Sequence, residues 1–221
     1  ATETTDEVHR LHCLFKIAEI YEEKIGDDSK AQERYWHVLE LSATFLPALR
    51  ALGRIFQRRE DWSSLVNLYL REAEAIADSG HWLDVMGRVS VLQEEKLGAL
   101  DAAARTWEMV LEKMPDYLPA LRALARLHYR RGDWAALAAI NLREAALTSD
   151  PQTVAALLHK TGEIYEDRLA TAEDAIRCYR GALDHVPNFL PAMRSLGRLA
   201  ARRGAWKEVV ETELLEAENV A

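Results

Sequence analysis

A spacing of 72 residues runs through the chain and constrains its fold more than any other sequence feature. The stretch LPALRALGRIFQRREDW, which begins at Leu46, returns as LPALRALARLHYRRGDW at Leu118 and as LPAMRSLGRLAARRGAW at Leu190. The three repeats lie at about 7–78, 79–150 and 151–221. Because a chain that repeats throughout leaves no room for a separate globular core, we expect a single stacked array over 1–221.

Each repeat contains four stretches in which apolar residues recur at helical spacing, and no strand pattern competes with them. In the first repeat, Leu14, Ile17 and Tyr21 begin such a stripe. Proline falls at the expected start of the third helix of every repeat, where its missing N–H costs nothing. These prolines are Pro47, Pro119 and Pro191. The sequence therefore predicts an all-α fold of twelve helices in six antiparallel pairs.

Half of 72 is 36 residues, close to the roughly 34 of a tetratricopeptide repeat. The fifth pair has the alternation of small and aromatic residues, followed by proline, with which that family packs its two helices. These residues are Gly162, Tyr165, Ala175, Tyr179, Ala182 and Pro187. Over essentially its whole length the chain resembles tetratricopeptide repeats. The resemblance implies a right-handed superhelical solenoid, in which the first helix of each pair lines a concave surface where peptides or partner helices dock.

The even pairs depart from the family pattern. Where a small residue is expected early in the second helix they have Leu65, Leu137 and Val209. Where another is expected they have Glu72, Glu144 and Glu216. We therefore expect regular odd pairs to alternate with divergent even pairs.

A tryptophan follows each arginine-rich turn, as Trp62, Trp134 and Trp206. A large ring at the start of a helix can wedge between neighbouring pairs, so packing is the favoured role and partner binding the alternative.

Composition excludes several classes of function. The net charge of −8 argues against general affinity for nucleic acid or for anionic membrane. Charged residues interrupt every apolar run well short of the roughly 20 residues that span a bilayer. The two cysteines, Cys13 and Cys178, lie far apart in the sequence, which favours a reducing, cytoplasmic compartment. The first residues have neither an initiator methionine nor a signal pattern, so export stays open.

No phosphate-binding loop, zinc-protease motif, paired CxxC or nucleophile elbow is present, so we expect neither catalysis nor a cofactor. The alternative is a metal site at HRLHC, where His9, His12 and Cys13 could share one face of a helix. The later repeats do not keep these residues, which favours a simple helix near one end of the sequence.

Three arginines one turn apart, Arg50, Arg54 and Arg58, form a straight stripe on the side of the helix opposite Leu52. Both later repeats keep this row. Two acidic sets could neutralise it. One comprises Glu19, Glu23, Glu163 and Asp167 on the odd first helices, and the other comprises Glu72, Glu144 and Glu216. Recognition of acidic or carboxylate-bearing partners is the competing role.

In the middle repeat, Val91 stands where Glu19 and Glu163 stand in the others, which predicts under-neutralised arginines beside an aromatic residue. The expected partner site comprises Arg50, Arg54, Val91, Arg122, Arg126, Tyr129 and Arg130. The predicted function is a non-catalytic scaffold that binds a peptide segment or partner domain. Nucleic-acid binding through the arginine rows and a structural spacer in a larger assembly stay as alternatives. Leu215 in the last helix suggests a segment of a longer protein.

Overall fold

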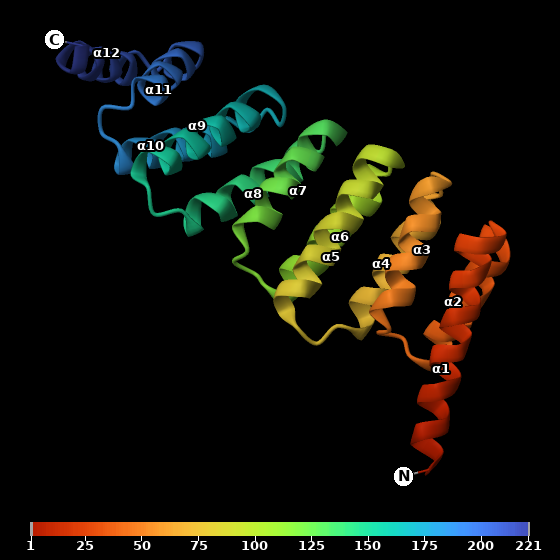
Figure 1. Cartoon of the computed structure of the whole chain (residues 1–221). Helices are drawn as coiled ribbons and strands as arrows, with labels where there is room; N and C mark the ends of the chain where they lie inside the picture. The colour runs from red at the N-terminus through yellow and green to blue at the C-terminus, as the bar shows by residue number, and fades with distance from the viewer. Residues whose placement is uncertain (1, 221) are drawn as a thin grey trace. The chain divides into compact units, whose positions relative to one another are not determined.

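The computed structural model describes the backbone of residues 2–220 and the side chains of residues 7–217. Between Thr2 and Val220 it has twelve α-helices and no strand, which confirms the predicted fold class (Figure 1). The helices are α1 (Thr2–Ile20), α2 (Asp28–Leu41), α3 (Leu46–Arg58), α4 (Trp62–Ala75), α5 (Ser79–Val91), α6 (Leu100–Lys113), α7 (Leu118–Arg131), α8 (Trp134–Leu147), α9 (Pro151–Asp167), α10 (Ala172–His185), α11 (Leu190–Arg202) and α12 (Trp206–Val220). Two π-helical segments, η1 (Tyr21–Ile25) and η2 (Leu92–Lys96), extend α1 and α5.

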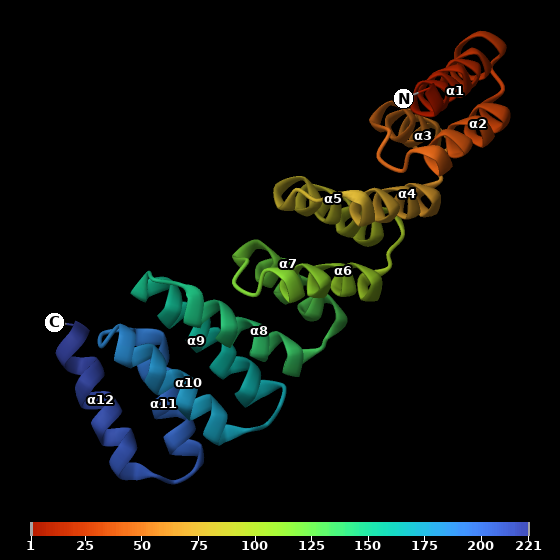
Figure 2. The same ribbon diagram turned by 90° about the horizontal axis from the view of Figure 1, so that it is seen from below.

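The helices form two compact units, each described here by itself. In the N-terminal unit, Ala1–Trp107, each helix from α1 to α5 packs on the next helix along the chain. In the C-terminal unit, Glu108–Ala221, the same holds from α7 to α12. Within each unit, successive helices run antiparallel, as Figures 1 and 2 show. The single array of three 72-residue repeats and its superhelical sense stay predictions.

Local signals set the helix boundaries. Pro47, Pro119 and Pro191 lie in the first turn of α3, α7 and α11, as expected. Aspartates cap other helices by accepting a hydrogen bond from a backbone N–H three residues ahead. These caps are Asp27, Asp61, Asp78, Asp133 and Asp150. None of the helices within the described residues is long and apolar enough to cross a bilayer.

The turns that follow α3, α7 and α11 need a left-handed residue. Gly132 and Gly204 supply it at φ 69°, whereas the first repeat has Glu60 at φ 54°. A side chain costs about 1–2 kcal/mol in this conformation. Glycine, in turn, lowers the free energy of unfolding by about 0.5–1 kcal/mol, because it gives the unfolded chain more conformational freedom. We expect Glu60→Gly to raise the free energy of unfolding by about 0.5 kcal/mol in urea denaturation. The reverse change, Gly132→Glu, should lower it, and a stabilisation by both would contradict this account of the turn.

Each unit has its own apolar core. In the N-terminal unit, Tyr35, Leu52 and Phe56 are almost fully buried. In the C-terminal unit, Tyr179 is fully buried among residues of α9, α10 and α11. A Cβ atom on Gly162 of α9 would lie 2.4 Å from Cε1 of Tyr179, so glycine is required for this ring to pack.

The tryptophans differ in burial. Trp62 and Trp134 are partly buried, and Trp134 packs against the cluster of Leu137, Ala138 and Ile164. The predicted packing role therefore fits these two. Trp206 is 68% exposed, so packing within the described residues does not explain it.

Candidate partner-binding site

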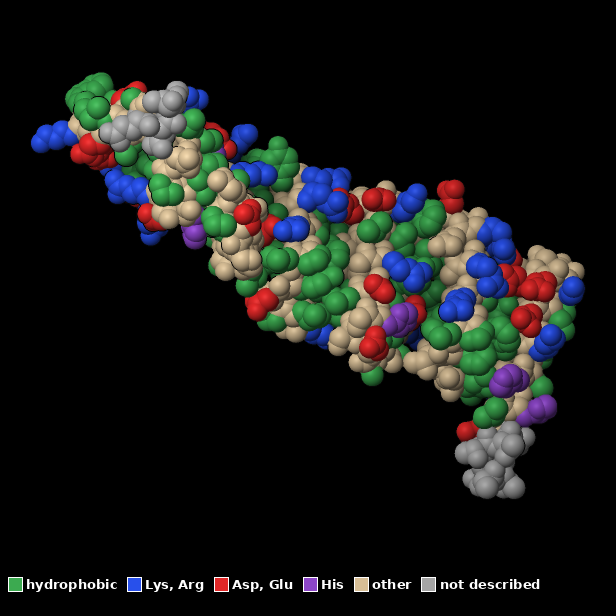
Figure 3. Space-filling model, turned by 60° about the vertical axis from the view of Figure 1, so that its left-hand side comes forward, with side chains coloured by type: hydrophobic (Ala, Val, Ile, Leu, Met, Phe, Trp, Pro, Cys, Tyr) green, Lys and Arg blue, Asp and Glu red, His purple; other side chains and the backbone are tan. Residues whose placement is uncertain are grey.

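Three rows of arginines project from α3, α7 and α11. They are Arg50, Arg54 and Arg58, then Arg122, Arg126 and Arg130, then Arg194, Arg198 and Arg202. All nine side chains are exposed, while Leu52 is fully buried, so the rows face away from the core as predicted. Basic and acidic side chains are interspersed on the face shown in Figure 3.

In the N-terminal unit the end of the arginine row meets Glu22, whose side chain is 7% exposed. The Arg54 guanidinium lies 3.3 Å from a Glu22 oxygen, and the Tyr35 hydroxyl donates a hydrogen bond of 2.8 Å to the same carboxylate. Burial, together with this hydrogen bond to an acceptor, raises the pKa of Tyr35 above its usual value. Arg58 pairs with Asp28 at 2.5 Å. These contacts join α3 to the first helix pair.

The C-terminal unit repeats this network around Glu166, whose side chain is 4% exposed. Arg198 and Arg202 approach the carboxylate to 3.0 and 2.8 Å, and the Tyr179 hydroxyl donates to it at 2.9 Å. Burial alone would raise the pKa of Glu166. The hydrogen bonds from Arg198 and Tyr179 and the two positive charges outweigh burial, so the pKa is lowered.

The prediction that Glu19 and Glu163 neutralise the arginines is therefore wrong. Glu19 pairs with Lys16 at 3.6 Å, and Glu163 lies 3.9 Å from the His159 ring, while Glu22 and Glu166 meet the arginines. The hydroxyls of Tyr35 and Tyr179 bind the carboxylates that lie one turn further along, and both tyrosines come from the second helix of the pair.

This correction also removes the argument for a vacancy at Val91. In the middle repeat the counterpart of Glu22 and Glu166 is Glu94, which is present and 7% exposed. Val91 is 46% exposed, but it does not occupy the position from which Glu22 and Glu166 bind the arginines.

The second predicted acidic set is confirmed in two repeats. Arg122 donates to Glu144 and Arg194 donates to Glu216, both at 2.7 Å. The Glu144 side chain is only 8% exposed, so the guanidinium supplies the countercharge that burial requires.

The first repeat differs, because its glutamate has another neighbour. An oxygen of Glu72 lies 3.3 Å from Nε2 of His81 at the start of α5. Among the described residues, no carboxylate lies within ion-pairing distance of the Arg50 guanidinium. Arg50 thus keeps the hydrogen-bond donors that Arg122 and Arg194 use internally.

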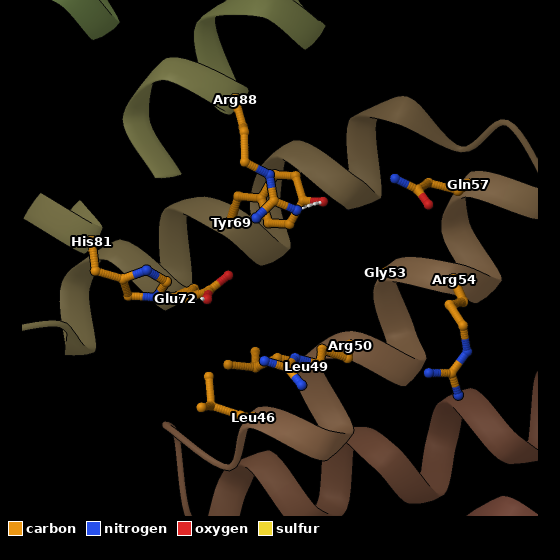
Figure 4. Close-up of a pocket in the computed structure, with 10 residues that line it drawn as sticks. All are labelled: Leu46, Leu49, Arg50, Gly53, Arg54, Gln57, Tyr69, Glu72, His81 and Arg88. Atoms are coloured by element: carbon orange, nitrogen blue, oxygen red, sulfur yellow. Dashed lines mark hydrogen bonds and ion pairs between the residues drawn. The ribbon is translucent and has the colours of Figure 1, made fainter. Parts of the chain in front are cut away.

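A cavity of about 400 Å³ opens beside Arg50 in the N-terminal unit (Figure 4). Its lining residues are Leu46, Leu49, Arg50, Gly53, Arg54, Gln57, Tyr69, Glu72, His81 and Arg88. The Arg88 guanidinium donates to the Tyr69 hydroxyl and lies 4.0 Å from the centre of that ring. Figure 4 shows Arg50 and Arg54 on α3 across an open space from the Tyr69 and Arg88 pair. The Arg50 guanidinium beside an apolar floor suits a segment that carries a carboxylate.

The C-terminal unit has a corresponding cavity of about 330 Å³, lined by residues of α7, α8 and α9. It is lined by Arg122, Ala125, Arg126, Tyr129, Leu137, Asn141, Glu144, Leu157 and Lys160. The Nδ2 amide of Asn141 is buried and has no hydrogen-bond acceptor in the described part of the chain. A buried donor without an acceptor favours a ligand that brings one.

The structure thus groups the predicted site residues by unit. Arg50 and Arg54 share the first cavity, and Arg122, Arg126 and Tyr129 share the second. Val91 and Arg130 are not among the lining residues, and a patch that joins both units stays a prediction.

Sequence reasoning missed Tyr69, His81 and Arg88. A signal was available for the last, because every repeat has a basic residue at this position, as Lys16, Arg88 and Lys160.

The three residues of HRLHC do not converge. Sγ of Cys13 lies 3.6 Å from the His9 ring, while Nδ1 of His12 faces the Val8 carbonyl at 2.8 Å and its ring lies edge-on to Phe45. Within the described residues, no group of three or more His, Cys, Asp or Glu could hold a metal ion.

The sequence pattern of the family described as Tetratricopeptide repeat matches residues 48–81 and 120–155. Within these two segments the chain has the tetratricopeptide repeat pattern. Both matches begin in an arginine-bearing helix, α3 or α7, and run through the next helix to the start of a third. They therefore fall on even pairs, which were expected to diverge from the family pattern. The family pattern thus matches the second and fourth helix pairs, although the odd pairs were expected to be the more regular ones.

No curated protein matches the chain. Several solved tetratricopeptide structures are similar to it. MamA is 17% identical over 76% of this chain and 93% of its own, with a TM-score of 0.48. MamA 41-end from Desulfovibrio magneticus RS-1 is 15% identical over 78% and 96%, with a TM-score of 0.41. YrrB, a tetratricopeptide protein with an unusual peptide-binding site, is 16% identical over 82% and 89%, with a TM-score of 0.42.

Proposed function

We propose that the chain is a non-catalytic scaffold that binds a carboxylate-bearing segment of a partner protein. The observation that carries this proposal is Arg50. Its counterparts Arg122 and Arg194 are neutralised by glutamates on the following helix, whereas Glu72 contacts His81 and leaves Arg50 facing a cavity. A guanidinium with free donors binds a carboxylate through two parallel hydrogen bonds.

Preorganisation supports the same function. The α3, α4 and α5 helices that line the cavity are fixed by a buried core, so a ligand meets positioned donors and does not have to order them. The cavity in the C-terminal unit, with Arg122, Arg126, Tyr129 and the buried Asn141 amide, also offers donors to the acceptor groups of a partner. Cys13 and Cys178 are free thiols, which supports action in the cytoplasm.

The test measures fluorescence anisotropy of a labelled oligoglutamate peptide and of its oligoglutamine counterpart. We expect the wild-type protein to prefer oligoglutamate. We expect Arg50→Gln to weaken that binding about tenfold, because a charge-assisted hydrogen bond contributes about 1.5 kcal/mol.

The matched control is Arg194→Gln, which removes an arginine whose donor is already used by Glu216. It should change affinity by less than about twofold. Equal losses in the two variants would show that general positive charge, and not the free donors of Arg50, attracts the peptide. Equal affinity for the two peptides would overturn the proposal.

A further inference from the structure

Two residues that contact each other in the first repeat are both replaced in the second. In the N-terminal unit the Arg88 guanidinium on α5 donates a hydrogen bond to the Tyr69 hydroxyl on α4. One repeat of 72 residues later, these positions hold Lys160 on α9 and Asn141 on α8. The α8 and α9 helices pack on each other, as α4 and α5 do. A donor and its acceptor in one unit are therefore an ammonium group and an amide in the other.

Neither replacement has an acceptor among the described residues. Asn141 is 3% exposed, and its Nδ2 amide is buried without a hydrogen-bond partner in the described part of the chain. Lys160 is exposed, and within residues 7–217 no carboxylate pairs with its ammonium group. Glu163, one turn further along α9, lies 3.9 Å from the His159 ring. A buried donor without an acceptor costs free energy, and a ligand that brings an acceptor removes this cost.

Asn141 and Lys160 both line the cavity of the C-terminal unit, together with Arg122 and Tyr129 of α7. The acidic residue of this lining, Glu144, accepts a hydrogen bond of 2.7 Å from Nε of Arg122, so its charge is balanced within the chain. Tyr129 is 60% exposed, which leaves its side chain accessible to a ligand. Lys160 therefore adds a positive charge to a cavity that also has a buried amide donor.

The donors come from three helices, which favours a ligand whose acceptors point in several directions. The α7 helix supplies a hydroxyl and a guanidinium group, α8 the amide and α9 the ammonium group. A carboxylate has two oxygens in one plane. A phosphoryl group has three strong acceptor oxygens in a tetrahedral arrangement and a charge of about −1.5 to −2 at neutral pH. The number of donors, their origin on three helices and the positive charge therefore suit a phosphoryl group better than a carboxylate.

We propose that the cavity on α7, α8 and α9 binds a phosphorylated serine or threonine of a partner protein. The Asn141 amide and the Lys160 ammonium group donate to the phosphoryl oxygens, and the Tyr129 hydroxyl donates from α7. Binding at this cavity then depends on phosphorylation of the partner. The inference rests on the proposed function only in that a segment of another protein binds to the chain, because the group recognised and the residues that recognise it are different.

The experiment measures fluorescence anisotropy of three labelled alanine peptides whose central residue is phosphoserine, serine or glutamate. We expect the phosphoserine peptide to bind at least about tenfold more tightly than the other two, because only its phosphoryl group supplies three charged acceptors. Equal binding of the phosphoserine and glutamate peptides would refute the proposal, since any anion would then suffice. Displacement of the peptide by an equal concentration of inorganic phosphate would identify a free ion as the ligand, and the proposal would fail.

The Asn141→Leu variant tests the buried amide by two measurements. We expect it to weaken binding of the phosphoserine peptide about tenfold, because it removes a donor to a charged acceptor. Its melting temperature should equal or exceed that of the wild type, because leucine has a similar shape and removes a buried donor that has no acceptor. A lower melting temperature with unchanged peptide binding would contradict the proposal, since the amide would then serve the fold.

The Lys160→Gln and Lys16→Gln variants form a matched pair, because both remove one positive charge from the same position of the repeat. Lys16 pairs with Glu19 at 3.6 Å and does not line the cavity. We expect Lys160→Gln to weaken binding of the phosphoserine peptide about tenfold and Lys16→Gln to weaken it less than about twofold. Equal losses would mean that general positive charge attracts the peptide, against the proposal.

The Arg50→Gln variant separates this inference from the proposed function. A loss of phosphoserine binding in Arg50→Gln that is absent in Asn141→Leu would place the phosphoryl group in the first cavity. That result would overturn the inference and leave the proposed carboxylate site standing. Conversely, oligoglutamate binding that is indifferent to Arg50→Gln would count against the proposed function, while a loss of phosphoserine binding in Asn141→Leu would still support the phosphoryl site.

Discussion

Replacing Glu166 with glutamine should lower the free energy of unfolding by about 2 kcal/mol, a loss typical of a buried group that receives charged hydrogen bonds. The carboxylate accepts from Arg198, Arg202 and the buried Tyr179 hydroxyl. Glutamine has only one acceptor oxygen, and its NH2 group would place hydrogen-bond donors against the donors of the arginines and the tyrosine. We choose the lower part of the range because the arginine side chains are 47% and 61% exposed and lose little when they return to water. Urea denaturation followed by circular dichroism measures the change.

The control for this prediction is Glu163→Gln, one turn earlier on α9. Its carboxylate is half exposed and lies near His159, so its replacement should cost less than about 0.5 kcal/mol. Equal effects of the two substitutions would mean that the carboxylate of Glu166 adds nothing beyond a surface charge.

The pH dependence of stability follows from the lowered pKa of Glu166. Because the folded pKa lies below the unfolded one, this contribution is complete above the ordinary carboxyl pKa of 4.5 and is lost as pH falls through the folded value. The stability difference between wild type and Glu166→Gln should therefore be largest near neutral pH and shrink in acid. A difference that grew in acid would contradict the sign.

Replacing Gly162 with alanine should lower the free energy of unfolding by about 2–3 kcal/mol, in the upper range for overpacking. The added Cβ would lie 2.4 Å from Cε1 and 2.7 Å from Cδ1 of Tyr179. The fully buried ring cannot move aside without disturbing α10. Thermal unfolding and urea denaturation both measure the loss. In a helix without the steric clash, alanine in place of glycine raises stability, so a loss of stability would identify the contact with Tyr179 as the cause.

The matched control is Gly87→Ala in α5, where the nearest side-chain atom would be 3.8 Å away in Trp107, an ordinary contact. This variant should be neutral or gain up to about 1 kcal/mol through helix propensity. The other repeats have Ala18 and Ser90 at the position of Gly162, and in both the helix passes into a π-helical segment shortly afterwards. A neutral Gly162→Ala variant would mean that α9 can adopt the same change.

Only part of the candidate site could be predicted from the sequence. Repetition identified the arginine rows and paired Arg122 with Glu144 and Arg194 with Glu216, because each pair joins the two helices of one hairpin across a short turn of constant length. It could not show that Glu72 meets His81, because that contact joins α4 to a helix outside the hairpin. Arg50 keeps its hydrogen-bond donors free because Glu72 contacts His81 instead.

By itself the sequence determined the number, order and type of the helices and which side of each is buried. These properties follow from apolar spacing, first-turn prolines and aspartate caps, which act within a few residues of the chain. Only the tertiary structure decided that Glu22 and Glu166, and not Glu19 and Glu163, neutralise the arginines. Burial beside a tyrosine hydroxyl selects the carboxylate, and that hydroxyl arrives from another helix. The same dependence on neighbours is seen at the tryptophans, because Lys96 lies over the Trp62 ring and Arg168 lies over the Trp134 ring, and both cations come from the next helix along the chain.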